Sequence, residues 1–407
     1  MSRDTAGFTI PAHVPQELVR DFNFATFDGV ATDPYQVVAD LHNGPRIFFT
    51  PNDYAKPEGT WVITRADDMR ALLSDTERFS SKEHANFSRL LGETWPLLPL
   101  EVDPPNHLAY RKLLNPLFTP QAIEKLSGDI RELADELIDE MKRGNESEFM
   151  ASFGRKLPVS IFLKLMGLPL DHMSQFMEWV EGLLHSHTLE VMAGAARNIV
   201  EYLQEAIEDR AKNPREDIIS YVVNGKVNDR ALTDDEKIGI IFLAFSGGLD
   251  TVASSLGFML KYLAENPEAQ AKLRSNPALI PSAMEELYRY RSVVVTKRRA
   301  TQDTEFAGVL IKAGDWVTCP TMAANLDPNE FPEPLKVDFE RSPNRHLAFA
   351  FGAHRCLGVN LARRETVIAL EEILKRLPTF AIKEGAMPKM HGGGVFGVDE
   401  LHMVWGA

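Results

Sequence analysis

One apolar segment constrains the fold of this 407-residue chain more than any other feature. Residues 238–260, IGIIFLAFSGGLDTVASSLGFML, are long and apolar enough to resemble a membrane span. However, two glycines, an aspartate and several hydroxyls lie in its middle, and TDDE at 233–236 is a capping-box helix start. We therefore expect a buried central helix from about Asp234 to Asn266, ended by Pro267, which would be roughly 48 Å long.

Helical patterns dominate the rest of the sequence, for example over 189–212 and 267–275. Strand patterns are short: residues 46–51 and 61–65 are predicted to pair, and a second group is predicted within 296–320. The predicted fold class is therefore mainly α with a small β-rich lobe.

No repeat or linker divides the sequence, so we expect a single domain over residues 1–407. The two expected lobes are discontinuous in sequence. The β-rich lobe is predicted at about 34–65, 296–320 and 378–407, and the helical lobe at about 66–290 and 357–377.

The composition excludes several classes of protein. With 44% hydrophobic and 25% charged residues, the chain is expected to be soluble and globular. The net charge of -14 argues against nucleic-acid partners and against docking on anionic membranes. The two cysteines, Cys319 and Cys356, are too few for a disulfide framework, and the N-terminus has no apolar run typical of a secretory signal, so we expect a cytoplasmic protein.

Cys356 lies in FAFGAHRCLG, residues 349–358, and four roles are open to it. It could be a buried structural thiol, the usual role of a lone cysteine. A zinc site lacks further ligands at suitable spacing, and His354 is too near in sequence to be a typical base for a cysteine nucleophile. An axial thiolate to haem iron fits the flanking residues better, because Gly352 and Gly358 allow close backbone approach and a helix is predicted to start next to the sulfur.

Phe349, Gly352, Cys356 and Gly358 reproduce the FxxGxxxCxG signature of cytochromes P450. Three further stretches match that family in order and approximate spacing, so the resemblance covers about Asp33 to Trp405. They are AFSGGLDTVAS in the central helix, ExxR at Glu286 and Arg289, and ANLDPNEFPEPLKVDFER at 324–341.

The sequence most resembles the soluble bacterial camphor-hydroxylating P450s, notably in GGLDT and CLGVNLARRE. The resemblance implies the cytochrome P450 fold in a monomer. It also implies haem b (iron protoporphyrin IX) as cofactor, with Cys356 as the iron ligand.

Two adjacent glycines in the central helix, Gly247 and Gly248, cost about 2 kcal/mol of helix propensity relative to alanine. Close helix packing would explain one of them. We interpret the pair as a local opening of the helix that makes room for dioxygen, with a hydroxyl available to a freed carbonyl. The resemblance gives Thr251 and Asp250 the acid-alcohol roles, in which Thr251 holds the reduced dioxygen by hydrogen bonds and Asp250 admits protons.

The two haem propionates need cationic or hydrogen-bonding partners. His107 and Arg111, four residues apart on one predicted helical face, match the family's propionate-binding helix, and Arg298 and His354 match its other two partners. Thr296 stands where camphor-hydroxylating relatives tend to have an aspartate, which affects how propionate access is controlled.

Glu286 and Arg289 could form an ordinary surface ion pair. The resemblance instead places them with Arg341 in a buried network that stabilises the fold and retains haem.

The predicted substrate pocket is lined by Trp95, Leu243, Val294 and Val395, with core packing as the alternative for the three aliphatic residues. Trp95 replaces a hydrogen-bonding tyrosine of the camphor relatives, and Gly394 replaces a bulky aliphatic residue. We expect a small apolar substrate, a terpenoid-sized ketone or alcohol such as a norisoprenoid.

The chain has no flavin or iron–sulfur segment, so electrons must come from a partner. The resemblance points to a small acidic [2Fe-2S] ferredoxin with a flavin ferredoxin reductase. Candidate docking cations are Arg78, Arg111, Lys112, Arg345 and Arg355.

The predicted function is insertion of one oxygen atom of O2 into a C–H bond. A peroxide-driven peroxygenase, a non-catalytic haem sensor or carrier, and a cysteine hydrolase are the alternatives.

Overall fold

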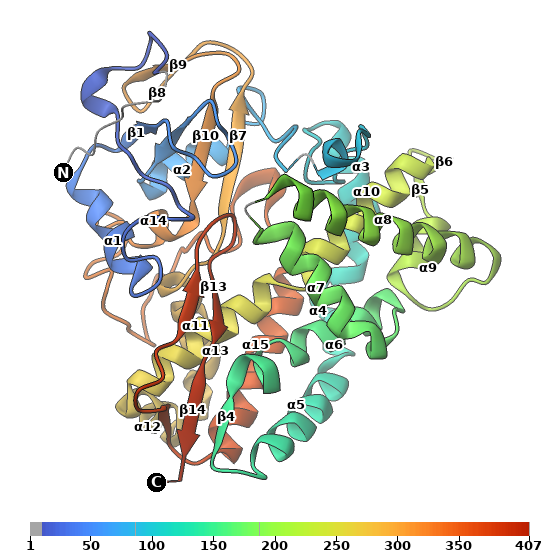
Figure 1. Cartoon of the computed structure of the whole chain (residues 1–407), viewed down its shortest axis with the longest axis vertical. Coiled ribbons are helices and arrows are strands. Elements are labelled where there is room, and N and C mark those ends of the chain that lie inside the picture. The colour runs from blue at the N-terminus through green and yellow to red at the C-terminus, as the bar shows by residue number, and fades with distance from the viewer. Residues whose placement is uncertain (1–9, 86, 187, 407) are drawn as a thin grey trace. The chain divides into compact units, whose positions relative to one another are not determined.

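The computed structural model describes residues 10–85, 87–186 and 188–406 (Figure 1). The chain divides into two compact units. Unit 1 comprises the described residues of Met1–His84, Ala278–Cys356 and Pro388–Asp399, and unit 2 those of Ala85–Pro277, Leu357–Met387 and Glu400–Ala407. The expectation of one domain with a β-rich and a helical lobe stays a prediction.

Unit 1 is built around a five-stranded sheet in the order β1-β2-β10-β7-β3. The predicted pair is confirmed, because β1 and β2 are antiparallel, with Ile47 opposite Ile63. Strand β10 runs parallel to β2 and antiparallel to β7, so the predicted pair and two strands of the second group share one sheet. Residues 304–311 of the second group form a separate two-stranded hairpin. In Figure 1 strand β1 is coloured blue and strands β7 and β10 are orange, so the sheet joins segments that are far apart in the sequence. The strands are β1 Ile47–Thr50, β2 Thr60–Ile63, β3 Phe79–Ser80, β7 Val295–Ala300 and β10 Trp316–Pro320.

Strands β2 and β10 are buried along their whole length, which explains why they are nearly continuous apolar runs. The inner strand β7 differs, because it carries Lys297, Arg298 and Arg299. Helix α2, Ala66–Ser74, contributes to the same core through Met69, Leu72 and Leu73, all with no exposed surface. Unit 1 therefore has its own hydrophobic core.

Short helices and hairpins complete unit 1. They are η1 Gln16–Leu18, α1 Pro34–Asp40, η2 Leu41–Asn43, α13 Ile280–Tyr290, β8 Thr304–Phe306, β9 Val309–Ile311, α14 Thr321–Asn325, η8 Gly352–His354, β12 Lys389–His391 and β13 Gly397–Glu400, with Glu400 itself counted in unit 2.

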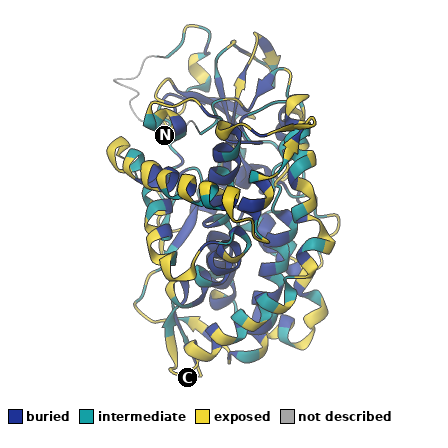
Figure 2. Ribbon diagram, turned by 90° about the vertical axis from the view of Figure 1, so that its right-hand side faces the viewer, coloured by how far each residue is buried: buried dark blue, intermediate teal, exposed yellow. Residues whose placement is uncertain are grey.

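Unit 2 is mostly helical, and the predicted helices over 189–212 and 267–275 are confirmed as α8 (Leu189–Lys212) and α12 (Pro267–Ser275). Its surface helices, such as α8, are exposed along one side and buried along the other, a division that Figure 2 shows by colour. The other helices are η3 Phe87–Leu91, α3 Asn106–Leu114, η4 Asn115–Phe118, α4 Pro120–Glu124, α5 Ser127–Met141, the π-helix η5 Met150–Gly154, α6 Lys156–Met166, η6 Leu170–His172, α7 Met173–Leu184, α9 Ile218–Val223 and α15 Val359–Arg376, and η7 Pro277–Leu279 begins at the unit boundary.

Two small sheets belong to unit 2. Strands β11, β14 and β4 form one, and β5 pairs with β6 in the other. Their bounds are β4 Glu146–Glu148, β5 Lys226–Val227, β6 Arg230–Ala231, β11 Phe380–Ile382 and β14 His402–Trp405.

The predicted central helix is present but interrupted. It forms α10, Asp234–Gly248, and α11, Thr251–Glu265, so the expectation of one continuous helix is wrong at the two residues between them. The predicted capping box is confirmed, since the Thr233 hydroxyl accepts a hydrogen bond from the Glu236 amide (3.2 Å) and the Glu236 carboxylate accepts one from the Thr233 amide (2.8 Å).

Together the two halves are long and apolar enough to cross a membrane by length and composition. In the most apolar stretch, however, 72% of the residues are buried inside the protein. This burial is typical of the core helix of a soluble protein.

Candidate functional site

The loop that carries Cys356 is held in place by its backbone. The Cys356 amide donates to the Phe349 carbonyl (2.9 Å), and the Arg355 amide donates to that of Gly352 (3.1 Å). Gly352 has φ of 72°, and a Cβ there would lie 2.5 Å from the Leu73 carbonyl oxygen at the end of α2. A glycine is therefore required at 352 to pack the loop on α2, whereas the sequence reading had assigned it to close approach of the cofactor.

The ring of Phe349 anchors the same loop to α13. Its centroid lies 4.8 Å from that of Tyr288 and 6.0 Å from that of His346. His346 in turn contacts Glu285 at 2.7 Å. The first residue of the predicted signature is thus a packing residue within unit 1.

The two cysteines lie in opposite environments. Cys319 is fully buried on β10, and burial raises the pKa of its thiol to about 12, against the opposing effect of Arg298 and Lys297. Cys356 is exposed on its loop. Because the thiolate is the form that binds metal, Cys319 is a poor candidate for an iron ligand.

A buried group of cations surrounds Arg298 in unit 1. Arg298 is 1% exposed, and its Nη1 donates to the Thr296 hydroxyl (3.1 Å) and to the Lys297 carbonyl (2.7 Å). Burial, followed by the positive charges of Arg298, Lys56 and Lys297, lowers the pKa of His84 to about 3. Lys297 is itself paired with Asp53 at 2.6 Å, so Arg298 is the candidate partner in this group for a carboxylate ligand.

His84 and Lys56 were missed by the sequence reading, because no local pattern sets them apart. Thr296, the noted departure from the camphor relatives, lies within hydrogen-bond reach of Arg298. His354 precedes Cys356 in the same loop, and its Nε2 lies 3.1 Å from the Ser81 hydroxyl.

The other two residues predicted for the propionates are on α3 in unit 2. His107 is 1% exposed, and burial, followed by the charge of Arg111, lowers its pKa to about 4. His107 is therefore neutral at physiological pH, and a neutral imidazole carries one N–H donor and one acceptor nitrogen. Arg111 lies one helical turn further along the same face.

The break between α10 and α11 is stabilised by the predicted threonine. The Thr251 hydroxyl donates a hydrogen bond to the Gly247 carbonyl at 3.3 Å. This carbonyl is one that the interrupted helix leaves without its usual intrahelical donor.

The two glycines before the break differ in role. A Cβ at Gly248 would lie 2.5 Å from the Phe162 ring of α6, so this glycine is needed for packing. At Gly247 a Cβ would meet no atom within 4 Å, and Gly247 is exposed. Gly247 thus leaves an open space beside the break.

Asp250 lies within the break, 8% exposed, and its Oδ2 is 3.3 Å from Nε2 of His185 at the C-terminal end of α7. The sequence reading had identified no partner for this aspartate. It missed His185 because 65 residues separate the two in sequence.

The residues predicted for the substrate pocket differ in how deeply they are buried. Trp95 is 4% exposed, packs 5.3 Å from the Phe242 ring and donates its indole N–H to Glu93, so it is part of the core of unit 2. Leu243 is half-buried and lies one turn before the exposed Gly247 on the same helix face.

Val294 and Val395 form an isolated antiparallel bridge in unit 1. Both are half-buried, whereas their neighbours Val293, Val295 and Phe396 are buried. The bridge therefore presents the two valine side chains on its accessible side.

The ExxR residues form a buried network in unit 1. Glu286 and Arg289 have no exposed surface, and Arg289 donates to both carboxylate oxygens of Glu286 at 2.7 and 2.8 Å. Arg341 (3.0 Å) and Asn344 (3.1 Å) also donate to Glu286. An ordinary surface ion pair is excluded by this burial.

The predicted docking cations are not all available. Arg78 is paired with Asp75, and Arg345 is paired with Glu330. Of the other three, Arg355 belongs to unit 1, and Arg111 and Lys112 belong to unit 2.

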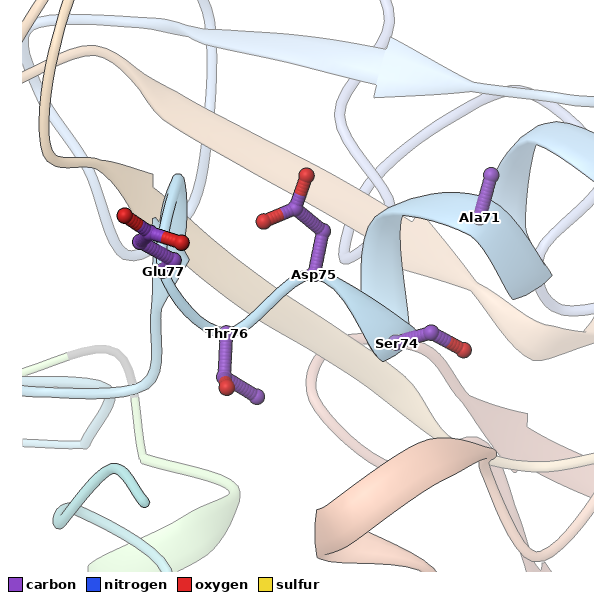
Figure 3. Close-up of a pocket in the computed structure, with 5 residues that line it drawn as sticks. All are labelled: Ala71, Ser74, Asp75, Thr76 and Glu77. Atoms are coloured by element: carbon purple, nitrogen blue, oxygen red, sulfur yellow. The ribbon is translucent and has the colours of Figure 1, made fainter. Parts of the chain in front are cut away.

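A surface depression of about 410 Å³ at the end of α2 is lined by none of the predicted site residues. Figure 3 shows its lining, which is Ala71, Ser74, Asp75, Thr76 and Glu77.

A family model described as Cytochrome P450 matches residues 158–401, more than half of the chain. The chain belongs to the cytochrome P450 family. It is 45% identical over 402 residues to Probable cytochrome P450 127A1 of Sinorhizobium fredii (strain NBRC 101917 / NGR234), with 97% of each protein covered. It is 34% identical over 360 residues to Mycinamicin IV hydroxylase/epoxidase of Micromonospora griseorubida, covering 86% of this chain and 90% of that protein.

The crystal structure of Cytochrome P450 CYP101C1 superimposes with a TM-score of 0.88 at 33% identity, covering 98% of this P450 and all of that chain. That of CYP101J2 gives 0.86 at 31% identity, with the same coverage. The P450 fold and the resemblance to the camphor-hydroxylating group are thus confirmed. Membership also makes this protein a haem-thiolate monooxygenase, an oxidoreductase that depends on redox partners and acts on a small substrate.

The residues present suit a haem. Unit 1 offers an exposed cysteine on a fixed loop and a buried cationic group, both of which a metalloporphyrin with two carboxylates requires. At Gly358 and at Gly247, a Cβ would meet no atom within 4 Å, which leaves room for a flat ligand beside the backbone.

Proposed function

We propose that this P450 hydroxylates a small apolar substrate, a terpenoid or norisoprenoid, with O2 and electrons from a [2Fe-2S] ferredoxin. The observation that carries the proposal is the break between α10 and α11, where Thr251, Asp250 and the open side of Gly247 occur together. A break of this kind in a buried helix costs helical hydrogen bonds, so it is expected where function requires it.

Cys356 is the proposed iron ligand. Its sulfur is on an exposed residue, whereas burial disfavours the thiolate of Cys319. When bound, haem b supplies the iron at which dioxygen is reduced and activated.

The propionates are assigned to four residues in two pairs. In unit 1, Arg298 supplies a fixed positive charge and His354 an imidazole, and in unit 2, Arg111 and neutral His107 supply the same combination. Phe349, Gly352 and Gly358 shape the loop, and Gly247 and Gly248 shape the helix wall.

Proton delivery is assigned to Asp250 and Thr251. The Thr251 hydroxyl can rotate from the Gly247 carbonyl to a new acceptor, so it can hold and donate a proton at Oγ1. Asp250 is buried beside His185, and a carboxylate next to an imidazole can accept a proton on one side and release it on the other.

Glu286, Arg289 and Arg341 are proposed to be structural, because both arginines donate to the buried Glu286 carboxylate within unit 1. The substrate-lining role is assigned to Leu243, Val294 and Val395, which are half-buried, and Trp95 packs beside Phe242 in the core of unit 2. The setting is proposed to be the cytoplasm, with a monomeric enzyme and a flavin ferredoxin reductase.

The ligand assignment is tested with Cys356→Ser and Cys319→Ser as a matched pair. We expect Cys356→Ser to abolish the red-shifted Soret band that thiolate ligation gives to the reduced carbon monoxide complex, and Cys319→Ser to retain it. The opposite result would assign the ligand to Cys319.

The reaction is tested with a reconstituted ferredoxin, its reductase and NADH. Hydroxylated product carrying label from ¹⁸O2 supports the monooxygenase, and Thr251→Ala should consume NADH without forming product. If hydrogen peroxide supports turnover at a rate that Asp250→Asn does not change, the enzyme is instead a peroxygenase. Ligand binding without any turnover would indicate a sensor or carrier.

A further inference from the structure

Tyr54 lies in the loop between β1 and β2, and its neighbours fix its position. One oxygen of Asp53 accepts hydrogen bonds from the amides of Ala55 (2.9 Å) and Lys56 (2.8 Å). The other accepts one from the buried ammonium of Lys297 (2.6 Å), and that ammonium lies 4.6 Å from the centre of the Tyr54 ring. The ring is therefore held by a cation–π contact and by a loop tied to the central sheet.

The hydroxyl end of Tyr54 reaches the segment that carries Gly394. A Cβ at Gly394 would lie 3.2 Å from the tyrosine oxygen. The segment itself is fixed, because the Gly394 carbonyl accepts from the Val295 amide (2.9 Å) and the next residue, Val395, bridges Val294. The space left by the missing side chain at Gly394 is thus occupied by the phenol of Tyr54, so it does not enlarge a cavity.

The Tyr54 hydroxyl differs from other tyrosine hydroxyls of this P450. Tyr35 donates to the Ser292 carbonyl (3.1 Å), Tyr110 to Glu236 (2.6 Å) and Tyr221 to the Leu113 carbonyl (3.1 Å). Within residues 10–85, 87–186 and 188–406, no hydrogen bond of the Tyr54 hydroxyl is found, although the residue is half-buried.

The phenol is also held in its neutral form. Burial, followed by the Asp53 carboxylate, raises the pKa of Tyr54, so the hydroxyl keeps its proton across the physiological range. A neutral phenol of this kind is a hydrogen-bond donor that discriminates strongly in favour of ligands with an acceptor.

We propose that Tyr54 is a specificity-determining residue whose hydroxyl donates a hydrogen bond to an oxygen atom of the substrate. The substrate class is then an apolar molecule that carries one acceptor oxygen, a ketone, ether or alcohol. The inference rests on the proposed function, in which Val294 and Val395 line the substrate pocket, and Tyr54 belongs to unit 1 together with them. Trp95, whose indole N–H is bonded to Glu93, cannot supply this donor without breaking that bond.

The test compares ligand pairs that differ by one oxygen atom. Dissociation constants are measured by equilibrium dialysis of the haem-loaded protein with camphor and camphane, and with β-ionone and the hydrocarbon of the same skeleton. In the wild type, at least one ketone should bind more tightly than its hydrocarbon. Tyr54→Phe should weaken binding of that ketone about fivefold to tenfold and leave the hydrocarbon within twofold. Tyr221→Phe, on α9, is the matched control and should change neither.

A second variant separates the hydrogen bond from the fold. Gly394→Ala brings a methyl group against the hydroxyl and should weaken ketone binding several-fold in the wild type but not in the Tyr54→Phe background. The proposal is overturned if no ketone is preferred by the wild type, if Tyr54→Phe weakens ketone and hydrocarbon equally, or if it weakens neither. The reduced carbon monoxide spectrum is recorded on every sample, so that failure of haem-thiolate binding is distinguished from failure of the Tyr54 assignment.

Discussion

Two buried carboxylates of this P450 have contrasting partners. Glu286 on α13 is bonded to Arg289 and Arg341, whose guanidinium groups keep their charge at any physiological pH. Asp250, between α10 and α11, lies beside His185, whose imidazole is a group that can both accept and donate a proton. The first arrangement can only stabilise, whereas the second can also move a proton. The difference indicates how to distinguish a structural carboxylate from one that takes part in chemistry.

The largest effect is expected from breaking the fixed network. Arg289→Ala leaves Glu286 charged and buried, so the free energy of unfolding should fall by about 3–5 kcal/mol. Urea denaturation measures the free energy of unfolding, and the haem content after gel filtration measures cofactor retention. Glu333→Gln, which removes an exposed ion pair with Lys336, is the control and should change stability by less than about 0.5 kcal/mol.

Asp250→Asn tests the other carboxylate. Turnover should fall about a hundredfold, equivalent to about 2.7 kcal/mol, because proton delivery is impaired, while the urea midpoint stays near that of the wild type. Product formation and the solvent deuterium isotope effect are measured together. Asp234→Asn, at an exposed aspartate, should change neither. If Asp250→Asn unfolds the protein as Arg289→Ala does, the contrast between the two carboxylates is lost.

The adjacent glycines sharpen the contrast within the helix itself. Gly248→Ala should lower the free energy of unfolding by about 1–3 kcal/mol, because its methyl group would overlap the Phe162 ring. Gly247→Ala should instead stabilise the helix by up to about 1 kcal/mol and reduce turnover if this face lines the oxygen site. Thermal denaturation and product assays on both variants give the result, and equal destabilisation would contradict the separate roles.

The smallest effect concerns a third carboxylate, Glu236, at the start of α10. Hydrogen bonding from Arg230 is the largest cause that lowers the pKa of Glu236 to about 2, from an ordinary value of 4.5. Since the folded pKa is depressed, its stabilisation is present above pH 4.5 and is lost as the pH falls towards 2. Glu236→Gln should cost about 1 kcal/mol at pH 7 and little near pH 2. A cost that does not change over this range would contradict the assignment.

The fold was largely predictable where local patterns dominate. Helix α8 matches its predicted bounds, and the capping box before α10 could be recognised in the sequence because it depends on two residues only three positions apart. The pairing of β10 with β2 could not be predicted from the sequence. It joins residues some 250 positions apart, and local patterns do not encode the register between distant strands.

The candidate site divides in the same way. The residues with a fixed motif spacing, Cys356 and the Asp250–Thr251 pair, could be located from the sequence. His84, His185 and Tyr54 could not, because each acquires its importance from a neighbour that only folding supplies.

The sequence by itself indicated the haem-thiolate chemistry, since the signature residues around Cys356 lie at a fixed short spacing that can be recognised before the fold is known. Tertiary structure alone decided which of two glycines packs and which lies open, which cysteine is buried, and that a histidine accompanies the aspartate. The physical reason is that burial, proton exchange and steric room depend on atoms from distant segments, and these come together only when the chain folds.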